Sequence, residues 1–578
     1  MILVAPERIA EFRSRGWWGD LTHGDLLDAH AAKRPDAAAL VDPPNTQGIV
    51  GRAPRSLTWR ELAAEVERLM AVLHGAGLRK DDVLLVQLPN VVELSVAYLA
   101  AFKLGIIVTP APVQYREHEL SGIVRRTEAK AAITAASING QDHVAPLRNL
   151  PIRQVFSLGL HEGAVELAPA MAAIGPAEIE AARAAARSAA VTADDVATIC
   201  WTSGTEAEPK GVPRSHNEWI IMAAGVVAAA GLEEGARLLN PFPMVNMGGV
   251  STALTGWLLV GATLIQHHPF DLAVMLGQMR DHAIDYTVAP PAVLNMLAKD
   301  PALLEGVDFT RLRAIGSGSA PLSQAMIETF KDRYGVEIVN YFGSNEGMSL
   351  CGTAADIPAA SERATFFPRV GAPGFKWAYP LADRFFTRLV DPDTEAEIDG
   401  PGRIGEMRIK GPTVFSGYWR APELTAKSFD ADGWFRTGDL FEIAGDRDQF
   451  YRFVGRLKDI IIRGGVNISS EEIEGHLLAH PQIADAAVVG APDERLGERL
   501  CAFIVPRPGE APTRETINAW LTGERKLAVF KQIERLEVLP ILPRNPVGKV
   551  LKRDLRAGFG VMSLLPLWEK VAPRSGVG

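Results

Sequence analysis

Residues 201–211 have the sequence Trp201-Thr202-Ser203-Gly204-Thr205-Glu206-Ala207-Glu208-Pro209-Lys210-Gly211 and follow an apolar run, 196–201. The apolar run predicts a buried strand, and α/β folds bind their ligands where such strands end. Small hydroxyl residues and a glycine can present hydroxyls and backbone N–H groups to an anion, and Lys210 adds a point charge. Pro209 and the Gly211-Val212-Pro213 continuation exclude a Walker loop, in which Gly-Lys-Ser/Thr opens a helix. The stretch therefore predicts a phosphate-binding loop, with a hydroxyl-rich surface turn as the alternative.

The regions around this loop predict an α/β fold. Helical spacing in 60–73 and 92–104 alternates with apolar strands at 83–88, 106–108, 286–289, 313–316 and 336–341. Strands that are apolar throughout indicate sheets covered on both faces. Short strands, turns and glycines dominate from about 365 to 455, and a smaller α+β unit begins after Lys458. We expect a large N-terminal domain, 1–454, with two covered, mostly parallel α/β sheets and a β-rich subdomain, a hinge at 455–458, and a small α+β C-terminal domain, 459–578.

One helix start in the small domain has a recognisable cap. Ser469-Ser470-Glu471-Glu472 predicts a capping box, in which Ser469 caps the helix and Glu472 reaches back to it. These glutamates are therefore expected to be cap and solvent groups rather than ligands.

Bulk composition narrows the functional class. The chain has 578 residues and a net charge of −9, which argues against nucleic acid or an acidic membrane surface as a partner. Its three cysteines, Cys200, Cys351 and Cys501, are too far apart for a metal motif or a disulfide framework. The apolar run 254–264 is too short to span a bilayer, and the first residues do not resemble a signal peptide. We expect a cytoplasmic protein without a membrane span.

Further polar motifs follow predicted strands or turns, and each has an ordinary structural interpretation as well. Residues 542–550 carry a lone lysine, Lys549, in a loop punctuated by prolines. Residues 340–347 offer an aromatic ring and Glu346, which suits a hard cation, although a lone carboxylate is more often a cap. Residues 432–440 contain Asp432 and Asp439, and a carboxylate there could contact ribose hydroxyls or belong to a turn. Residues 316–321 form a partial glycine fingerprint, but no third glycine or acidic ribose partner supports a nicotinamide dehydrogenase.

Taken in order and spacing, these motifs resemble the adenylate-forming superfamily, which includes acyl- and aryl-CoA ligases, peptide-synthetase adenylation domains and beetle luciferases. The resemblance runs from about Trp17 to Leu555. It implies that a carboxylate attacks the α-phosphate of ATP to give acyl-AMP and pyrophosphate, and that a thiol such as CoA then displaces AMP. It also implies a bound Mg²⁺ and a mobile C-terminal domain that carries the catalytic lysine.

The resemblance assigns roles to residues motif by motif. The residues that would line the phosphate loop are Thr202, Ser203, Gly204, Thr205 and Lys210. The adenine would be bordered by Ser319, Ala320 and Phe342, and the ribose would be held by Asp439 and Arg456. Glu346 would bind Mg²⁺, and Asn345 would lie near the α-phosphate. Lys549 would bridge the attacking carboxylate and the α-phosphate, so Lys549, Thr202 and Glu346 are the expected catalytic residues. Lys458 matches the hinge of the family. The tunnel for a pantetheine thiol matches Gly464 and Gly465. The acid pocket matches Asn246, Met247, Gly248 and Gly318.

The sequence departs from the family pattern in three places. Glu206 and Ala207 replace a hydroxyl residue and a glycine in the phosphate loop, and a glutamate there repels triphosphate unless it points away or meets a cation. Asn345 replaces a threonine but can still donate through its amide. Residues 245–249, Val-Asn-Met-Gly-Gly, lack the histidine or aromatic residue that often borders the acid.

The identity of the acid and the thiol stays open between several hypotheses. Residues 8–18 resemble both siderophore aryl acid–AMP ligases and CoA ligases for alicyclic, aromatic or medium-chain acids, and Pro213-Arg214-Ser215-His216-Asn217 resembles the former. Asn246 could recognise a ring hydroxyl, but the simpler interpretation is a helix cap. The leading hypothesis is a CoA ligase for an apolar acid. The alternatives are an aryl-acid ligase that loads a carrier protein and an adenylate-binding protein without catalysis. A homodimer through the tail after Leu555 is a further hypothesis.

Overall fold

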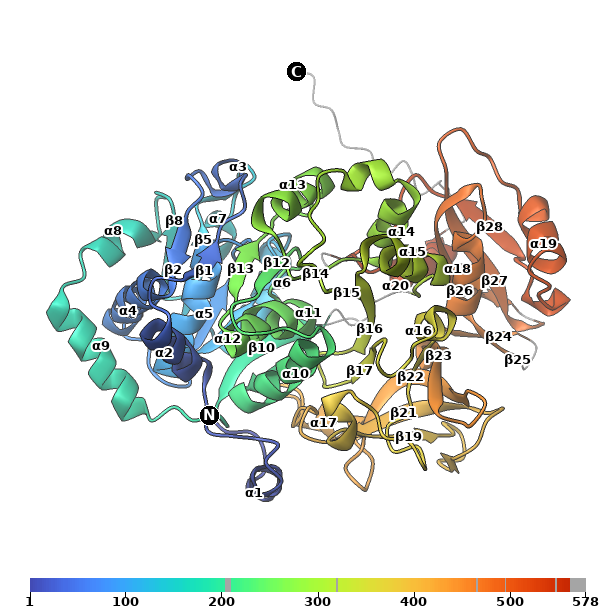
Figure 1. Cartoon of the computed structure of the whole chain (residues 1–578), viewed down its shortest axis with the longest axis horizontal. Helices are drawn as coiled ribbons and strands as arrows, with labels where there is room; N and C mark the ends of the chain where they lie inside the picture. Colours follow the sequence, from blue (N-terminus) through green and yellow to red (C-terminus); the bar gives the residue numbers. More distant parts are fainter. Residues whose placement is uncertain (203–208, 319–320, 464–465, 494, 546–547, 562–578) are drawn as a thin grey trace. The chain divides into compact units, whose positions relative to one another are not determined.

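The computed structural model describes residues 1–202, 209–318, 321–463, 466–493, 495–545 and 548–561 (Figure 1). Its chain forms two compact units. Unit 1 contains residues 1–202, 210–387 and 409–435, and unit 2 contains 388–408 and the chain from 436 onwards. The domain boundary at 455–458 remains a prediction.

One sheet of unit 1 has the strand order β11-β10-β4-β3-β5-β8-β9. Its strands are β3 (Val83–Val86), β4 (Ile107–Pro110), β5 (Ala131–Ala135), β8 (Gln154–Leu158), β9 (Val165–Glu166), β10 (Val196–Thr202) and β11 (Lys210–Ser215). All pairs are parallel except β10 with β11. The predicted strand before the phosphate-loop motif is therefore confirmed as β10. The strand that follows the motif, β11, pairs with β10 in the antiparallel direction.

The second sheet of unit 1 has the order β17-β16-β15-β14-β12-β13-β1-β2. Its strands are β1 (Ala38–Val41), β2 (Ser56–Thr58), β12 (Arg237–Asn240), β13 (Thr263–Gln266), β14 (Tyr286–Val288), β15 (Ala314–Gly318), β16 (Glu337–Gly343) and β17 (Ser349–Gly352). Only the edge pairs, β1 with β2 and β16 with β17, are antiparallel. Two mostly parallel sheets were expected, and both are present.

Unit 1 also contains helices, and two of them lie where helical spacing predicted them, at 60–73 and 92–104. The helices are α1 (Pro6–Ser14), α2 (His23–Lys33), α3 (Thr46–Val50), α4 (Trp59–Gly75), α5 (Val92–Leu104), α6 (Glu117–Thr127), α7 (Ala145–Arg148), α8 (Leu167–Ala172), α9 (Pro176–Ala189), α10 (His216–Ala229), α11 (Met247–Gly249), α12 (Gly256–Val260), α13 (Leu272–His282), α14 (Pro291–Lys299), α15 (Gln324–Tyr334), α16 (Ala360–Thr365) and α17 (Pro422–Ser428). A π-helical turn, Val250–Thr255, joins α11 to α12. Within the described parts of the chain, no helix combines the length and apolar character needed to cross a membrane.

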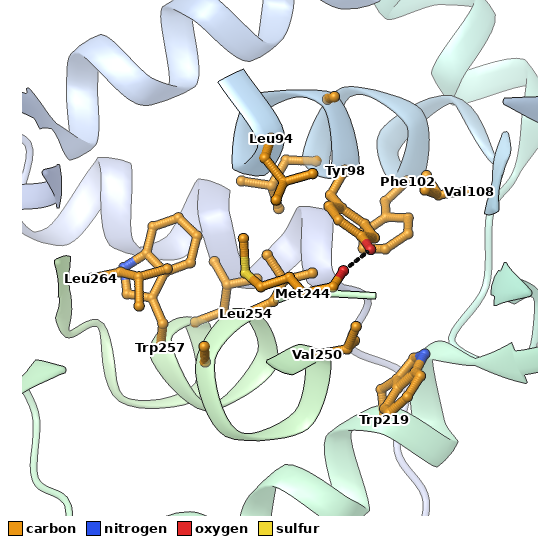
Figure 2. Close-up of a cluster of buried hydrophobic side chains, with 14 of the residues drawn as sticks. Leu94, Tyr98, Phe102, Val108, Trp219, Met244, Val250, Leu254, Trp257 and Leu264 are labelled. Carbon is orange, nitrogen blue, oxygen red and sulfur yellow. Dashed lines mark hydrogen bonds between the residues drawn. The ribbon is translucent and has the colours of Figure 1, made fainter. Parts of the chain in front are cut away.

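The main core of unit 1 anchors the segment that carries α11. Helix α5 is buried on nearly all sides, and the Tyr98 hydroxyl in this helix donates to the main-chain oxygen of Met244, just before α11 (Figure 2). Val250, Leu254 and Trp257 point into the same cluster from the π-helical turn and α12 (Figure 2). Because interiors are close-packed, these contacts hold the backbone around α11 in one position.

Unit 2 is built mainly from two further sets of strands. One contains β19 (Phe386–Val390), β20 (Glu397–Ile398), β21 (Ile404–Lys410), β22 (Phe435–Ala444) and β23 (Phe450–Arg456), in the order β23-β22-β21-β19-β20. The other contains β24 (Ile460–Arg463), β25 (Val466–Ser469), β26 (Ile483–Asp493), β27 (Gly497–Pro506) and β28 (Arg535–Val538), with helices α18 (Ser470–Leu478), α19 (Arg514–Gly523) and α20 (Lys552–Val561). The predicted β-rich and α+β regions are confirmed.

The predicted cap of α18 is half right. Ser469 Oγ accepts a hydrogen bond from Glu472 N at 3.1 Å, as expected for an N-cap. The expected return contact from the Glu472 carboxylate is wrong, because this carboxylate pairs with Lys531 Nζ at 2.6 Å. The Lys531 ammonium, 59 positions away in sequence, binds the Glu472 carboxylate that the local sequence pattern assigns to the cap.

Candidate functional site

The phosphate-loop motif joins the antiparallel strands β10 and β11. Thr202 is the last residue of β10, Lys210 is the first of β11, and the two are register partners. Ser203, Gly204, Thr205, Glu206 and Ala207 lie outside the described residues. Thr202 and Lys210 therefore stand opposite each other where the hairpin begins and ends.

Lys210 and Glu346 are connected through Tyr418, a residue that sequence reasoning missed. The Lys210 Nζ lies 5.3 Å from the centre of the Tyr418 ring, within the range of a cation–π contact. The Tyr418 hydroxyl donates to Glu346 Oε1 at 3.0 Å. Burial and the nearby negative charge of Glu346 raise the pKa of Tyr418, so this hydroxyl stays a donor at neutral pH. The only sequence signal for Tyr418 is an aromatic pair, Tyr418-Trp419, after a glycine.

The turn after β16 carries Asn345 and Glu346. Asn345 Oδ1 accepts from Met247 N at 2.7 Å, which ties the turn to α11. The main-chain oxygen of Glu346 accepts from Phe415 N at 3.0 Å, which ties it to the segment leading to Tyr418. Phe342 lies in β16 and packs edge-on against Phe367, with 5.7 Å between ring centres. The turn is therefore held on two sides, once through the Asn345 side chain and once through the Glu346 main-chain oxygen.

The Glu346 carboxylate fits a hard divalent cation. Tyr418 occupies Oε1, and none of the described residues donates a hydrogen bond to Oε2. Mg²⁺ prefers oxygen ligands and is commonly held by one or two carboxylates together with substrate phosphates. Glu346 can supply such a carboxylate oxygen.

Asn246 begins α11 as its N-cap. Its Oδ1 accepts from Gly248 N at 3.0 Å, which agrees with the simpler of the two sequence interpretations. A π-helical turn follows α11 directly, and such turns occur frequently at functional sites. Met247 lies over Gly343, because a Cβ at Gly343 would come within 2.0 Å of Met247 Cε. The expected acid-pocket segment is thus packed tightly against the end of β16.

Gly318 ends β15 and pairs with Tyr341 of β16. A Cβ at this position would lie 2.3 Å from the Tyr341 carbonyl oxygen, so only glycine permits this close approach of the two strands. Ser319 and Ala320, the expected adenine neighbours, lie outside the described residues.

Unit 2 groups a second set of expected residues. Asp439 in β22 and Arg456 in β23 are register partners, and the Arg456 Nε lies 3.0 Å from Asp439 Oδ1. Asp439 is only 2% exposed. A buried carboxylate beside a guanidinium is oriented before any ligand arrives, as a group that accepts from two ribose hydroxyls should be.

Lys549 belongs to the same compact unit as Asp439 and Arg456. Its backbone N–H donates to Asn545 Oδ1 at 2.8 Å, which ties Lys549 to the residue four positions earlier. Desolvation around the ammonium group, together with the positive charges of Arg456 and Lys458, lowers the pKa of Lys549 to about 8.

Lys458 lies in a short 3-10 turn, Leu457–Asp459, at the predicted hinge. The next residue, Asp459, pairs with Arg556 of α20 at 2.7 Å. Burial opposes ionisation of Asp459, but attraction to Lys552 and Arg556 outweighs it and lowers the pKa of this carboxyl. Gly464 and Gly465, the expected tunnel residues, lie outside the described residues.

Comparisons with known proteins show the family of this chain. A model of the family described as AMP-binding enzyme matches residues 27–419, and a model of the AMP-binding enzyme C-terminal domain matches residues 472–549. Pyochelin synthase PchD of Pseudomonas aeruginosa is 33% identical over 559 residues, which are 96% of this chain and 96% of that protein. Medium-chain fatty-acid–CoA ligase of Escherichia coli is 32% identical and covers 95% of this chain and 92% of its own. The crystal structure of ATP-bound MatB from Rhodopseudomonas palustris has a TM-score of 0.74 at 26% identity, covering 94% of this chain and 100% of its own.

Proposed function

Since the chain belongs to the AMP-binding enzyme family and is an AMP-forming ligase, we propose that it joins an apolar carboxylic acid to CoA. In the first step the acid attacks the α-phosphorus of ATP, the bond to the bridging oxygen breaks, and pyrophosphate leaves. In the second step the CoA sulfur attacks the acyl carbon, AMP leaves and the thiol proton passes to solvent. The acid is aromatic, alicyclic or medium-chain.

The observation that best supports an apolar acid is the role of Asn246. Its amide oxygen caps α11, so the helix start already uses one of the two acceptor sites of this oxygen. Met247 and the two glycines after it leave an apolar, adaptable surface, as in many ligand pockets. Similarity to medium-chain fatty-acid–CoA ligase supports the same class of substrate.

A second candidate is an aryl acid–AMP ligase that loads the phosphopantetheine thiol of a carrier protein. Similarity to pyochelin synthase PchD over 96% of the chain favours it. The third hypothesis, an adenylate-binding protein without catalysis, has no comparable support, because the related proteins are named as synthases and ligases.

Each unit contributes its own groups to the proposed reaction. Lys549 places a positive charge where negative charge builds on the transferring phosphoryl group, and such preorganised charge is a large catalytic term. Asp439, oriented by Arg456, accepts hydrogen bonds from the ribose. Lys210 would line the phosphate loop, and Glu346 would hold Mg²⁺. When bound there, Mg²⁺ would supply positive charge to the phosphate oxygens. Rotation of residues 459–578 about Lys458 would then bring Gly464 and Gly465 to the thiol path.

The cysteines bear on the compartment in which we place the enzyme. Cys200, Cys351 and Cys501 are all buried and unpaired with one another. Free thiols suit a reducing compartment, so we propose the cytoplasm.

A panel of acids tests the function directly. Medium-chain, alicyclic, benzoic and hydroxybenzoic acids are incubated with ATP, Mg²⁺ and CoA, and the products are identified by mass spectrometry. We expect acyl-CoA from apolar acids and little from hydroxybenzoic acids. Acyl-AMP without acyl-CoA, followed by transfer to a phosphopantetheinylated carrier protein, would replace this proposal with the second candidate.

The pKa of Lys549 predicts the pH dependence of adenylation. The protonated ammonium is the catalytic form, and its pKa is lowered to about 8, so charge is lost as the pH rises through 8. We therefore expect kcat/KM for acid-dependent exchange of labelled pyrophosphate into ATP to fall above pH 8, because this parameter reports the free enzyme.

Lys549→Arg is the matched control for the pH profile. The guanidinium stays protonated throughout the pH range of the experiment. The fall in kcat/KM above pH 8 should therefore disappear in this variant, even if the overall rate is lower. A limb at pH 8 that persists in Lys549→Arg would assign the titration to another group.

A further inference from the structure

Arg214 is a buried cation that the proposed chemistry does not use. It lies in β11, four residues after Lys210, and its side chain is fully buried. Both Nε and Nη2 donate to the main-chain oxygen of Asn345, the former at 2.8 Å, and Nη1 donates to the main-chain oxygen of Thr413. Its contacts with these two segments are therefore to main-chain carbonyls.

Burying a guanidinium carries a large desolvation penalty. Burial lowers the pKa of Arg214, and the negative charges of Glu218 and Glu346 partly oppose that change. Glu218 is itself buried and accepts from Ser215 N at 2.7 Å. An apolar side chain of similar volume would remove the donors to the carbonyls of Asn345 and Thr413 and would leave the buried Glu218 carboxylate without its cation.

The two carbonyls bonded by Arg214 belong to the two segments that flank Glu346. Asn345 is the residue before Glu346, and Thr413 lies in the segment that leads to Tyr418. The same segments meet again through Thr413 Oγ1, which donates to Gly347 O at 3.0 Å, and through Phe415 N, which donates to Glu346 O. The planar fork of arginine can hold both carbonyls in one fixed geometry, which an ammonium cannot do.

We propose that Arg214 is a positioning residue that clamps the Asn345–Glu346 turn to the segment carrying Tyr418, and so sets the Glu346 carboxylate for Mg²⁺. The clamp extends to α11, because Asn345 Oδ1 accepts from Met247 N. One buried cation therefore connects the metal-binding turn, the Tyr418 hydroxyl that orients its carboxylate, and the acid-pocket helix. This inference rests on the proposed role of Glu346 but not on the identity of the acid or the thiol.

The first test is Arg214→Met combined with Glu218→Gln, which removes the cation without leaving an unpartnered buried carboxylate. Hydrogen–deuterium exchange should become faster in peptides that contain 344–348 and 411–418, where Gly347 and Phe415 donate their backbone N–H groups. Calorimetric titration should show weaker binding of MgATP, and the half-saturating Mg²⁺ concentration in pyrophosphate exchange should rise about 10- to 100-fold. The KM for the acid should change less than the Mg²⁺ requirement.

Arg214→Lys provides a second variant that keeps a charge opposite Glu218. It should show the same shifts in exchange and Mg²⁺ dependence, because an ammonium cannot serve both carbonyls in the geometry of the fork. This variant keeps the proposal testable if the double variant fails to fold.

Arg363→Met is the matched control. Arg363 is also buried, at 2% exposure, and donates to the main-chain oxygens of Ile357 and Pro358 at 2.8 and 3.2 Å. The Arg363→Met variant should have a lower free energy of unfolding. Hydrogen–deuterium exchange in 344–348 and the half-saturating Mg²⁺ concentration should stay unchanged. Equal shifts in Arg363→Met, or unchanged exchange and Mg²⁺ dependence in folded Arg214→Lys, would overturn the proposal. Hydrogen exchange and MgATP binding are measured without any acid substrate. Failure of the clamp proposal in these measurements is therefore distinguishable from failure of the proposed function, which the acid panel tests.

Discussion

Lys549→Ala should reduce acid-dependent exchange of labelled pyrophosphate into ATP by at least about 100-fold, the scale expected when one preorganised transition-state contact is removed. The loss should fall mainly on kcat, because the ammonium matters most when charge builds on the α-phosphate during attack. Binding of ATP, measured by calorimetry, should change much less.

The same variant separates the two half-reactions. Thioester formation from synthetic acyl-AMP and CoA has no phosphoryl transfer for Lys549 to stabilise, so it should survive in Lys549→Ala. Arg553→Ala is the matched control, since Arg553 is an exposed cation nearby whose ion pair is with the adjacent Asp554. It should leave both steps nearly unchanged. Normal pyrophosphate exchange in Lys549→Ala would remove this lysine from the mechanism.

Glu346→Gln should lower kcat/KM for pyrophosphate exchange by about 100-fold and raise the Mg²⁺ concentration needed for half-maximal rate. The glutamine keeps the shape of the side chain and can still accept from the Tyr418 hydroxyl, which lies 3.0 Å from Oε1. It loses the negative charge that a hard cation prefers. A magnesium titration at constant ATP, together with calorimetry of MgATP binding, measures the effect.

Tyr418→Phe distinguishes charge from orientation at this carboxylate. It removes the hydroxyl that positions Glu346 but leaves the charge and the ring near Lys210. We expect kcat/KM for pyrophosphate exchange to fall about tenfold, which corresponds to the loss of one hydrogen bond to a charged group. If Glu346→Gln has the magnesium requirement of the parent enzyme, Glu346 does not hold the metal.

Local patterns predicted the elements that position the site. The apolar run 196–201 became β10, the helical spacing in 92–104 became α5, and the run 336–341 became part of β16. The polar motifs expected at the ends of strands, around Lys210 and Glu346, lie there. Such predictions succeed because hydrophobic period and turn chemistry depend on neighbouring residues.

The partners of those side chains were not predictable in the same way. Tyr418 is 72 positions from Glu346, and Arg214 is 131 positions from Asn345. Glu472 was assigned to a local cap, but Lys531, 59 positions away, takes its carboxylate. A single sequence carries no signal for which distant side chain reaches a given group.

The sequence by itself determined the two mostly parallel sheets and the β-rich and α+β regions, because each element follows from residues close together in the chain. It also determined the family, and with it Lys549 and Glu346 as candidates, because the order and spacing of short motifs along the whole chain carry that resemblance. Only the tertiary structure decided that Asn246 caps α11, that Tyr418 holds the Glu346 carboxylate, and that Arg214 bonds the carbonyls on either side of it. The physical reason is that buried polar groups must find hydrogen-bond partners, and packing rather than sequence distance selects them.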